Sequence, residues 1–148
     1  GGHEKYGKDP LEPEWDICHM SYVWGIRGAK LQLLSDQGHT IAPPSADYNE
    51  REYILRHSKW GVMLHQNPIG LMTPLRAVMF SSYKLPIIAD YCVNNEPYKF
   101  FFEPLLHFNF NKSELQDLDR VKKAVDHNYR LVTDNTFRSS VEKALKHG

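Results

Sequence analysis

The sequence predicts an α/β fold in which helices cover both faces of a parallel sheet. Segments of strand character and segments of helix character alternate along most of the chain, which is the pattern of successive βαβ units. Two of the expected strands, 59–66 and 85–92, are nearly continuous apolar runs, as is typical of parallel strands buried on both faces. We therefore expect a Rossmann-like three-layer sandwich with a parallel sheet of about five strands and C-terminal helices packed on it.

The length and composition of the chain fit one globular domain. It has 148 residues, of which 41% are hydrophobic and 24% are charged. We expect residues 14–148 to form a single Rossmann-like domain after a flexible, glycine-rich segment at 1–13, part of which is attributable to cloning. Eighteen basic side chains balance eighteen acidic ones, which disfavours nucleic acid as a partner. No apolar run approaches the ~20 residues of a membrane helix, so we expect a cytoplasmic protein without a membrane span.

The spacing of cysteine and histidine gives no sign of a metal site. Cys18 and Cys92 each lie in an apolar segment, and no CxxC pair is present, so both are expected to be buried free thiols. The chain has eight histidines, but none of them form an HxH or HxxxH pair. We therefore expect no zinc site; the expectation of no other bound metal and no cofactor comes from the family resemblance given below.

The first strand–helix unit is expected in residues 14–37. Residues 14–20 combine β-branched and aromatic side chains, which favour a short strand. Apolar residues such as Leu31 and Leu34 then recur at helical spacing over 25–37. Gly38 is a residue that commonly ends a helix.

A second, shorter unit follows. Residues 39–44 predict a short strand that two prolines end. A helix is expected within 45–58, and either Ser45 or Asp47 is its expected N-cap. Acidic residues early in this helix suit the positive end of the helix dipole.

The third unit consists of the strand at 59–66, a loop and a helix. Thr73 followed by Pro74 is a strong helix start, because the hydroxyl caps the helix and proline is favoured at the first helical position. This helix is expected to run to about Tyr83 and to lead into the buried strand at 85–92.

The C-terminal third predicts one more strand and two helices. The aromatic segment 99–110 is the candidate for an irregular fifth strand. Residues 112–148 have the pattern of two helices with a break near 129–135. Ser113 and Gln116 have the spacing of a capping box at the first of these helices.

Four loops are expected to meet at one rim of the sheet. The carboxyl ends of parallel strands share an edge, and ligands of such folds bind there. The loops at this rim are 20–25, 43–47, 65–73 and 91–98.

Two of these loops lead into helix starts that carry an arginine. Arg27 follows the first loop, while Thr73 and Arg76 stand at the start of the helix after the third loop. A helix N-terminus beside an arginine favours phosphate, because backbone N–H groups and the guanidinium both donate to its oxygens. The sequence therefore predicts a phosphate site at this rim.

Each of these rim residues also has a purely structural explanation, which the sequence leaves open: a solvated helix face for Arg27 and Lys30, an ion pair with Asp90 or Glu96 for Arg76, backbone contacts at a strand end for His65 and Gln66, and packing for Tyr22 and Trp24. His19 lies inside an apolar strand and is expected to be a hydrogen-bonded histidine of the core.

The stretch 58–91, SKWGVMLHQNPIGLMTPLRAVMFSSYKLPIIADY, resembles the core of the C-terminal domain of GT-B glycosyltransferases. It looks closest to the family-1-type transferases related to spore-coat maturation proteins and to phage or bacterial polysaccharide enzymes. In that group, a strand ending in a polar pair leads to a "PLR" helix, a "GLP" turn and a buried strand. The earlier stretch DICHMSYVWGIRGAKLQLL is similar to the segment that opens this half of those enzymes. The resemblance covers roughly residues 14–100.

The resemblance implies a site for a nucleotide diphosphate sugar, whose parts would lie against three groups of residues: the base and ribose near Pro44, Ser45 and Glu96, the diphosphate near Arg27, Thr73 and Arg76, and the sugar near His65, Gln66 and Asn67. His65 and Arg76 are the catalytic residues that it implies. Such enzymes need no metal, because helix dipoles and cationic side chains stabilise the leaving diphosphate.

GT-B enzymes have two domains of this kind, and the acceptor binds mainly to the N-terminal one. A chain of 148 residues has room for one of them. We therefore expect the donor-binding half of a glycosyltransferase, which is inactive alone and acts with an N-terminal GT-B domain.

Two positions depart from the family pattern. Many relatives carry a glutamate that holds the donor ribose where this chain has Met79. The turn after the helix usually contains glycine, and the nearest residue here is Lys84, for which a left-handed conformation is strained.

These departures keep two other functions open. One is a non-catalytic, flavodoxin-like interaction module whose ligand site has decayed, with the aromatic segment 99–110 as an exposed contact surface. The other is a small-ligand α/β enzyme with His65 as general base, since imidazole titrates near neutral pH.

Overall fold

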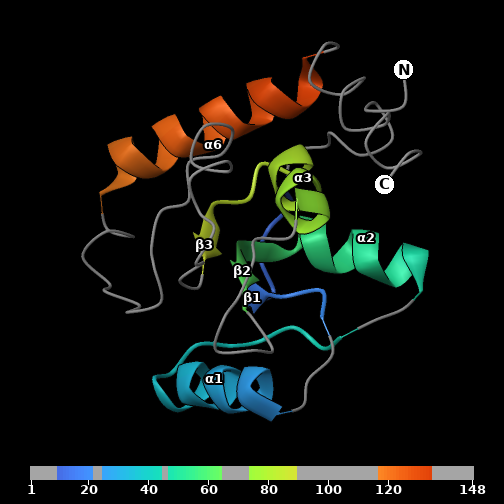
Figure 1. Ribbon diagram of the computed structural model, residues 1–148, viewed down its shortest axis with the longest axis vertical. Coiled ribbons are helices and arrows are strands. Elements are labelled where there is room, and N and C mark those ends of the chain that lie inside the picture. The colour runs from blue at the N-terminus through green and yellow to red at the C-terminus, as the bar shows by residue number, and fades with distance from the viewer. Residues whose placement is uncertain (1–9, 22–24, 45–46, 65–73, 90–116, 135–148) are drawn as a thin grey trace.

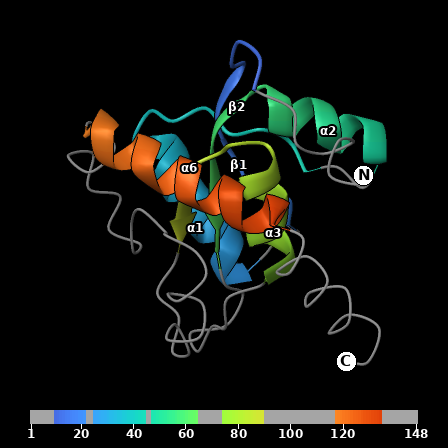
Figure 2. The same ribbon diagram turned by 90° about the horizontal axis from the view of Figure 1, so that it is seen from above.

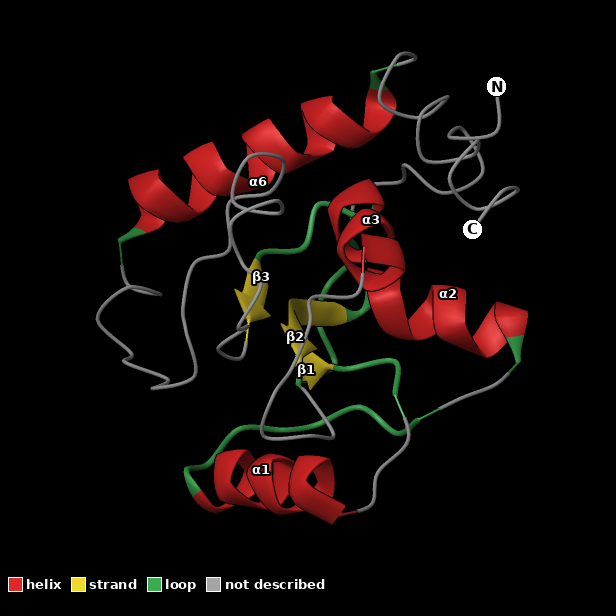
Figure 3. Cartoon of the chain, in the orientation of Figure 1, coloured by secondary structure: helices red, strands yellow, loops and turns green. Residues whose placement is uncertain are grey.

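The computed structural model describes residues 10–21, 25–44, 47–64, 74–89 and 117–134. These residues form an α/β structure with three strands and four helices (Figure 1, Figure 3). The predicted α/β class is therefore confirmed. The strands are β1 (Trp15–Cys18), β2 (Ser58–Met63) and β3 (Ile87–Ala89), and the helices are α1 (Gly25–Asp36), α2 (Tyr48–Arg56), α3 (Pro74–Ser82) and α6 (Leu118–Thr133).

The strands form a parallel sheet in the order β1-β2-β3. On the other side of β1, the predicted strand 39–44 is reduced to a single parallel bridge between Ile17 and Ile41. The two prolines that follow explain its shortness, because proline has no amide hydrogen to continue the ladder. The described residues thus supply three strands and one bridge of the predicted sheet of about five strands, and the segment 99–110 lies outside them.

Alternating side chains of the strands bury both faces of the sheet. Cys18, Met63 and Ile87 belong to one hydrophobic cluster, to which α2 and α3 contribute Ile54 and Phe80 among others. Residues adjacent to these in the strands, such as Ile17, Val62 and Ile88, belong to a second hydrophobic cluster on the opposite face of the sheet. This cluster consists of Ile17, Leu31, Leu34, Val62, Leu64, Ile88 and Ala124. Helix α1 therefore covers one face, and α2 and α3 cover the other (Figure 1).

Helix α6 packs along α3 at the β3 end of the sheet (Figure 2). It contributes Val132 to the first cluster and Ala124 to the second. Asp117 caps its start by accepting a hydrogen bond from the Arg120 amide at 3.2 Å. The helix ends within the predicted break at 129–135, while Ser113 and Gln116 lie outside the described residues.

Helix α3 approaches the sheet closely at Gly61. The ring of Phe80 occupies the space that a side chain at this position needs, since an added Cβ would lie 2.6 Å from its Cδ1 and Cδ2 atoms. Both residues are buried. The absence of a side chain at Gly61 therefore sets how closely α3 sits on β2.

Local side-chain chemistry defines the ends of α1 and α2. Asp47, one of the two predicted caps, accepts a hydrogen bond from the Glu50 amide at 3.0 Å, while Ser45 lies outside the described residues. Helix α1 ends just before Gly38, which adopts φ 94° and donates its amide to the Ser35 carbonyl at 3.0 Å. The predicted stop at Gly38 is confirmed.

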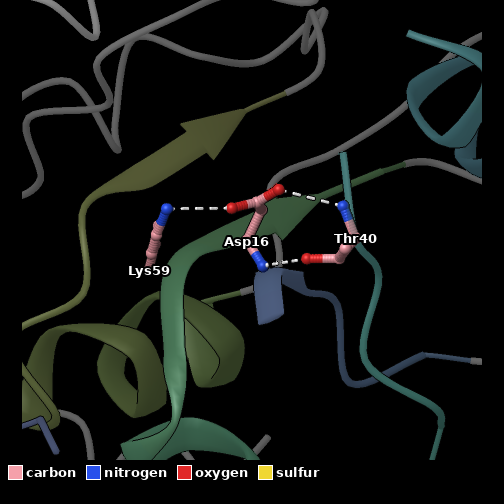
Figure 4. A network of polar contacts seen from close by, with 3 residues as sticks. All are labelled: Asp16, Thr40 and Lys59. Atoms are coloured by element: carbon pink, nitrogen blue, oxygen red, sulfur yellow. Dashed lines mark hydrogen bonds and ion pairs between the residues drawn. The ribbon is translucent and has the colours of Figure 1, made fainter. Parts of the chain in front are cut away.

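A polar network ties the 39–42 segment and β2 to β1 (Figure 4). Asp16 accepts a hydrogen bond from the Thr40 amide at 3.0 Å and pairs with the Lys59 ammonium at 3.1 Å. Its own amide donates to the Thr40 hydroxyl at 2.8 Å. Burial raises the pKa of Asp16, but these two partners outweigh burial and lower it overall. The network lies near the start of β1, away from the carboxyl ends of the strands.

Two other sequence predictions concern Cys18 and membrane spans. Cys18 is a buried free thiol, and burial raises its pKa to about 12, so it is inert as a nucleophile at neutral pH. Cys92 lies outside the described residues. Of the helices within the described ranges, none has the length and apolar character needed to cross a membrane.

Candidate anion site at the carboxyl ends of the strands

The topology creates a switch point between β1 and β2. After β1 the chain passes through α1 to the 39–42 segment on one side of β1, and it then returns through α2 to β2 on the other side. Connections that leave neighbouring strands in opposite directions open a crevice at their carboxyl ends, where ligands of open α/β sheets bind. His19 follows β1 at this crevice, and Leu64 follows β2.

Arg27 reaches this crevice from the first turn of α1. Its Nε donates a hydrogen bond to the Leu64 carbonyl at 3.1 Å, across 37 residues of sequence. This bond gives the carbonyl of Leu64, the residue directly after β2, a hydrogen-bond donor, and it holds the guanidinium at the carboxyl end of the strand. Burial lowers the pKa of Arg27, although an arginine remains charged at neutral pH.

Arg76 brings a second cation near Arg27 from the first turn of α3. It is partly buried, and burial lowers its pKa, as does the charge of Arg27. The two guanidinium groups therefore lie within each other's electric field. Within the described ranges no carboxylate is recorded as a partner of Arg76, and the predicted partners Asp90 and Glu96 lie outside these ranges.

His19 lies next to both arginines. Its side chain is 2% exposed, which confirms the predicted hydrogen-bonded histidine of the core. Burial and the charges of Arg27 and Arg76 lower the pKa of His19 to about 4, although backbone hydrogen bonds at Ala42 and Ser21 act in the opposite direction. The imidazole is therefore neutral at pH 7, and the two arginines carry the positive charge of this group.

The turn after β1 folds Ser21 back onto His19. The Ser21 Oγ lies 2.9 Å from His19 Nδ1, and the Ser21 amide donates to the same nitrogen at 3.3 Å. Met20 between them adopts φ 51°, a left-handed conformation that costs a residue with a side chain about 1–3 kcal/mol. Packing of Met20 against the first cluster helps to hold this turn.

Three of the sequence-predicted site residues lie within the described ranges. Arg27 donates to the Leu64 carbonyl at the end of β2 rather than only facing solvent, and its charge lowers the pKa of Arg76, while the predicted binding role of both stays a prediction. Pro44 is exposed at the end of the 39–44 segment. The remaining six lie outside the described residues: Ser45, His65, Gln66, Asn67, Thr73 and Glu96.

Met79 does not supply a polar contact for a ribose. It is partly buried against the first cluster and lines a cavity of about 270 Å³ between α2 and α3. Tyr48 and Leu75 line the same cavity and are exposed by about half. Arg51 and Glu52 of α2 also line it, and Glu52 is the carboxylate of this cavity.

The sequence pointed to Arg27 and Arg76 but not to the pairing of His19 with Ser21. Ser21 lies in a predicted rim loop, and His19 stands where a buried strand ends. A histidine two residues before a serine at such a strand end is the signal that could have identified the pair. The signal is weak, because it depends on the left-handed turn at Met20, for which methionine has no preference.

Comparisons of the chain with protein-family models, with curated proteins and with solved structures return no match.

Proposed function

We propose that the chain is the donor-binding half of a glycosyltransferase and holds a nucleotide diphosphate sugar at the carboxyl ends of β1 and β2. The observation that carries this proposal is the convergence of Arg27 and Arg76 on one crevice. Two partly buried like charges repel each other, and an anion bound to both would offset that repulsion. A diphosphate supplies that anion and can accept paired hydrogen bonds from each guanidinium.

Because residues 58–91 resemble the GT-B core, we extend the proposed ligand from a phosphate group to a complete nucleotide diphosphate sugar. Pro44, Ser45 and Glu96 are then proposed to contact the base and ribose. Thr73 adds its hydroxyl to the diphosphate site, and the sugar is proposed to lie against His65, Gln66 and Asn67. An N-terminal GT-B domain completes the enzyme and binds the acceptor, and the full five-stranded Rossmann-like sandwich belongs to the same proposal.

The arginines are proposed to act on the leaving group. When the bond between sugar and phosphate breaks, negative charge grows on the departing diphosphate. Fixed cations beside that charge stabilise the transition state more than the ground state, which is electrostatic catalysis. Arg27 is suited to this role because its hydrogen bond to the Leu64 carbonyl holds the guanidinium in place before the ligand binds.

Calorimetric titration with pyrophosphate and with UDP-, GDP- and ADP-sugars tests the proposal. The Arg76→Ala variant is expected to lose about 1.5–3 kcal/mol of diphosphate binding, because a charge-assisted hydrogen bond is removed. Arg130→Ala is the matched control, since Arg130 is exposed on α6, and it is expected to bind as the wild type does. Equal affinity of wild type and Arg76→Ala, or a folded wild type that binds none of these ligands, would contradict the proposal.

The alternative of a non-catalytic interaction module has one observation in its favour. Met79 stands where relatives carry the ribose-binding glutamate, and it lines an apolar cavity between α2 and α3. In that case the chain binds no nucleotide, and Tyr48→Ser or Leu75→Ser reduces an association that Arg76→Ala leaves unchanged. The same titration series, followed by size-exclusion chromatography of these variants, separates the two functions.

A further inference from the structure

The cavity between α2 and α3 is buried on one side and open on the other. Leu55 and Tyr83 line it and are each 2% exposed, whereas Tyr48 and Leu75 line it and are exposed by about half. A ligand can therefore enter past the exposed pair and be covered by the buried pair. The volume of about 270 Å³ lies just below the roughly 300–1,000 Å³ of ordinary small-molecule sites, so it suits a compound of one or two rings.

The lining of this cavity favours an aromatic compound. Two tyrosines, Tyr48 and Tyr83, contribute to it together with the thioether of Met79. Aromatic rings gain more than the burial of their surface when they meet other rings, and methionine sulfur makes favourable contacts with rings. An aromatic ring is therefore the apolar group that these side chains fit best.

Arg51 gives the cavity a hydrogen-bond donor. It lines the cavity from α2, and its Nε is buried and has no hydrogen-bond partner among the residues that the structure describes. A buried N–H without an acceptor costs free energy, so such groups are rare in folded proteins. An acceptor oxygen on a ligand in the cavity would remove this cost.

Glu52 makes a neutral ligand preferable to a charged one. It follows Arg51 on α2 and lines the same cavity, so an anion attracted by the guanidinium is repelled by the carboxylate, and a cation meets the opposite conflict. A carboxylate has several lone-pair positions. Glu52 can therefore accept a hydrogen bond from a ligand in addition to the interaction that it already makes.

We propose that this cavity is a binding site for a small, neutral aromatic amide. The carbonyl oxygen of the amide accepts from Arg51, its N–H donates to Glu52, and its ring packs between α2 and α3. An amide carries an acceptor oxygen and N–H donors in one small group, which matches the donor and the acceptor that line this one cavity. The proposed glycosyltransferase function neither requires nor uses this site.

Three probes that share a benzene ring test the polar recognition. Benzamide carries both the carbonyl and the N–H groups, acetophenone replaces the amino group by a methyl group, and benzoate carries a negative charge. We expect wild type to bind benzamide about 10-fold more tightly than either of the others, the effect of one hydrogen bond to a charged group. Titrations of the full chain, followed by the backbone amide NMR signals of α2 and α3, measure these affinities.

Substitutions on α2 assign the two contacts. Arg51→Met removes the donor and is expected to weaken benzamide and acetophenone alike, each by about 10-fold. Glu52→Gln removes the negative charge with little change of shape, so the affinity for benzoate is expected to rise relative to benzamide, a change that a merely structural Glu52 does not produce. Arg56→Met is the matched control, expected to bind as the wild type does. Arg56 lies on the same helix and also has a buried Nε without a partner in the described part of the chain, but it does not line the cavity.

The outcomes separate this site from the proposed function. A folded wild type whose α2 and α3 signals do not shift with benzamide overturns the proposal, as does equal affinity for the three probes or unchanged benzamide binding in Arg51→Met. A wild type that ignores benzamide but self-associates, and loses that association in Tyr48→Ser, uses the cavity as a protein contact, and the proposal then falls. Arg76→Ala is expected to bind benzamide as the wild type does, so failure of the diphosphate site leaves this one standing.

Discussion

The imidazole of His19 is buried beside two arginines and titrates well below its ordinary range. Burial disfavours the charged ring, and the neighbouring guanidinium groups disfavour it further. In the unfolded chain the same ring returns to a pKa near 6.5. One side chain thus links the stability of the fold to pH in the mildly acidic range.

The direction of this pH dependence follows from the lowered pKa. Because the folded pKa is about 4, the unfolded state binds more protons between this value and about 6.5. We therefore expect the free energy of unfolding of the wild type to fall as the pH falls through this window. Asparagine does not titrate, so this fall should be up to roughly 3 kcal/mol larger in wild type than in His19→Asn. Urea unfolding curves at several pH values measure the difference, and parallel pH profiles of the two proteins would contradict it.

The end of α3 shows how an element accommodates an unfavourable residue. The Lys84 amide donates to the Ser81 carbonyl at 3.1 Å and the Leu85 amide donates to the Phe80 carbonyl at 3.0 Å, which is the Schellman pattern. Lys84 takes the left-handed position of this motif with φ 56°, the conformation that the sequence marked as strained for a residue other than glycine. Its ammonium lies 4.7 Å from the centre of the Tyr129 ring on α6, so the strained residue also connects two helices.

Substitution at this position separates strain from contact. Lys84→Ala keeps the left-handed strain and loses the cation–π contact, whereas Lys84→Gly loses both. We expect Lys84→Gly to be more stable than Lys84→Ala by about 1 kcal/mol, the cost of left-handed backbone for a residue with a Cβ. Thermal unfolding of the two variants measures this difference. If they melt together, the turn is not strained at Lys84.

At the level of elements, the sequence identified features that depend on neighbouring residues. Asp47 caps α2 and Pro74 begins α3 as predicted, because capping and proline preferences act within a few residues. The bond from Arg27 to the Leu64 carbonyl spans 37 residues and follows only from the order of the strands. The predicted strand 39–44 was wrong in extent: pairing is limited to the bridge at Ile41, because the prolines after it end the ladder sooner than the segment's strand character indicated.

Over the whole molecule, the proposed function implies that the arginine pair opposes stability while it serves binding. The charge of Arg27 lowers the pKa of the partly buried Arg76, and under the proposed function a bound anion would offset the repulsion between them. Strained backbone and repulsion between neighbouring like charges are commonly found at functional sites. The stability of this protein should therefore depend on which anions are present.

An uncharged substitution exposes this trade-off. Arg76→Met keeps the length of the side chain and removes its charge, so without anions we expect its free energy of unfolding to exceed that of wild type by about 1 kcal/mol. Pyrophosphate at 100 times its wild-type dissociation constant should stabilise wild type by about 2.7 kcal/mol and the variant by only about 0.3–1.3 kcal/mol, because the variant binds it more weakly. Thermal unfolding with and without pyrophosphate measures both effects, with Arg130→Met as control, and a variant that is both less stable and equally protected would contradict the trade-off.

The arginine pair also bears on the handling of the protein in the laboratory. Under the proposed function, the arginine pair is expected to bind phosphate or sulfate from common buffers and precipitants, and such an ion would compete with any ligand under test. Purification in chloride-based buffer, followed by mass spectrometry under native conditions, will show what the site retained from the cell. The first anion to reveal the chemistry of this protein could therefore be one that was already bound.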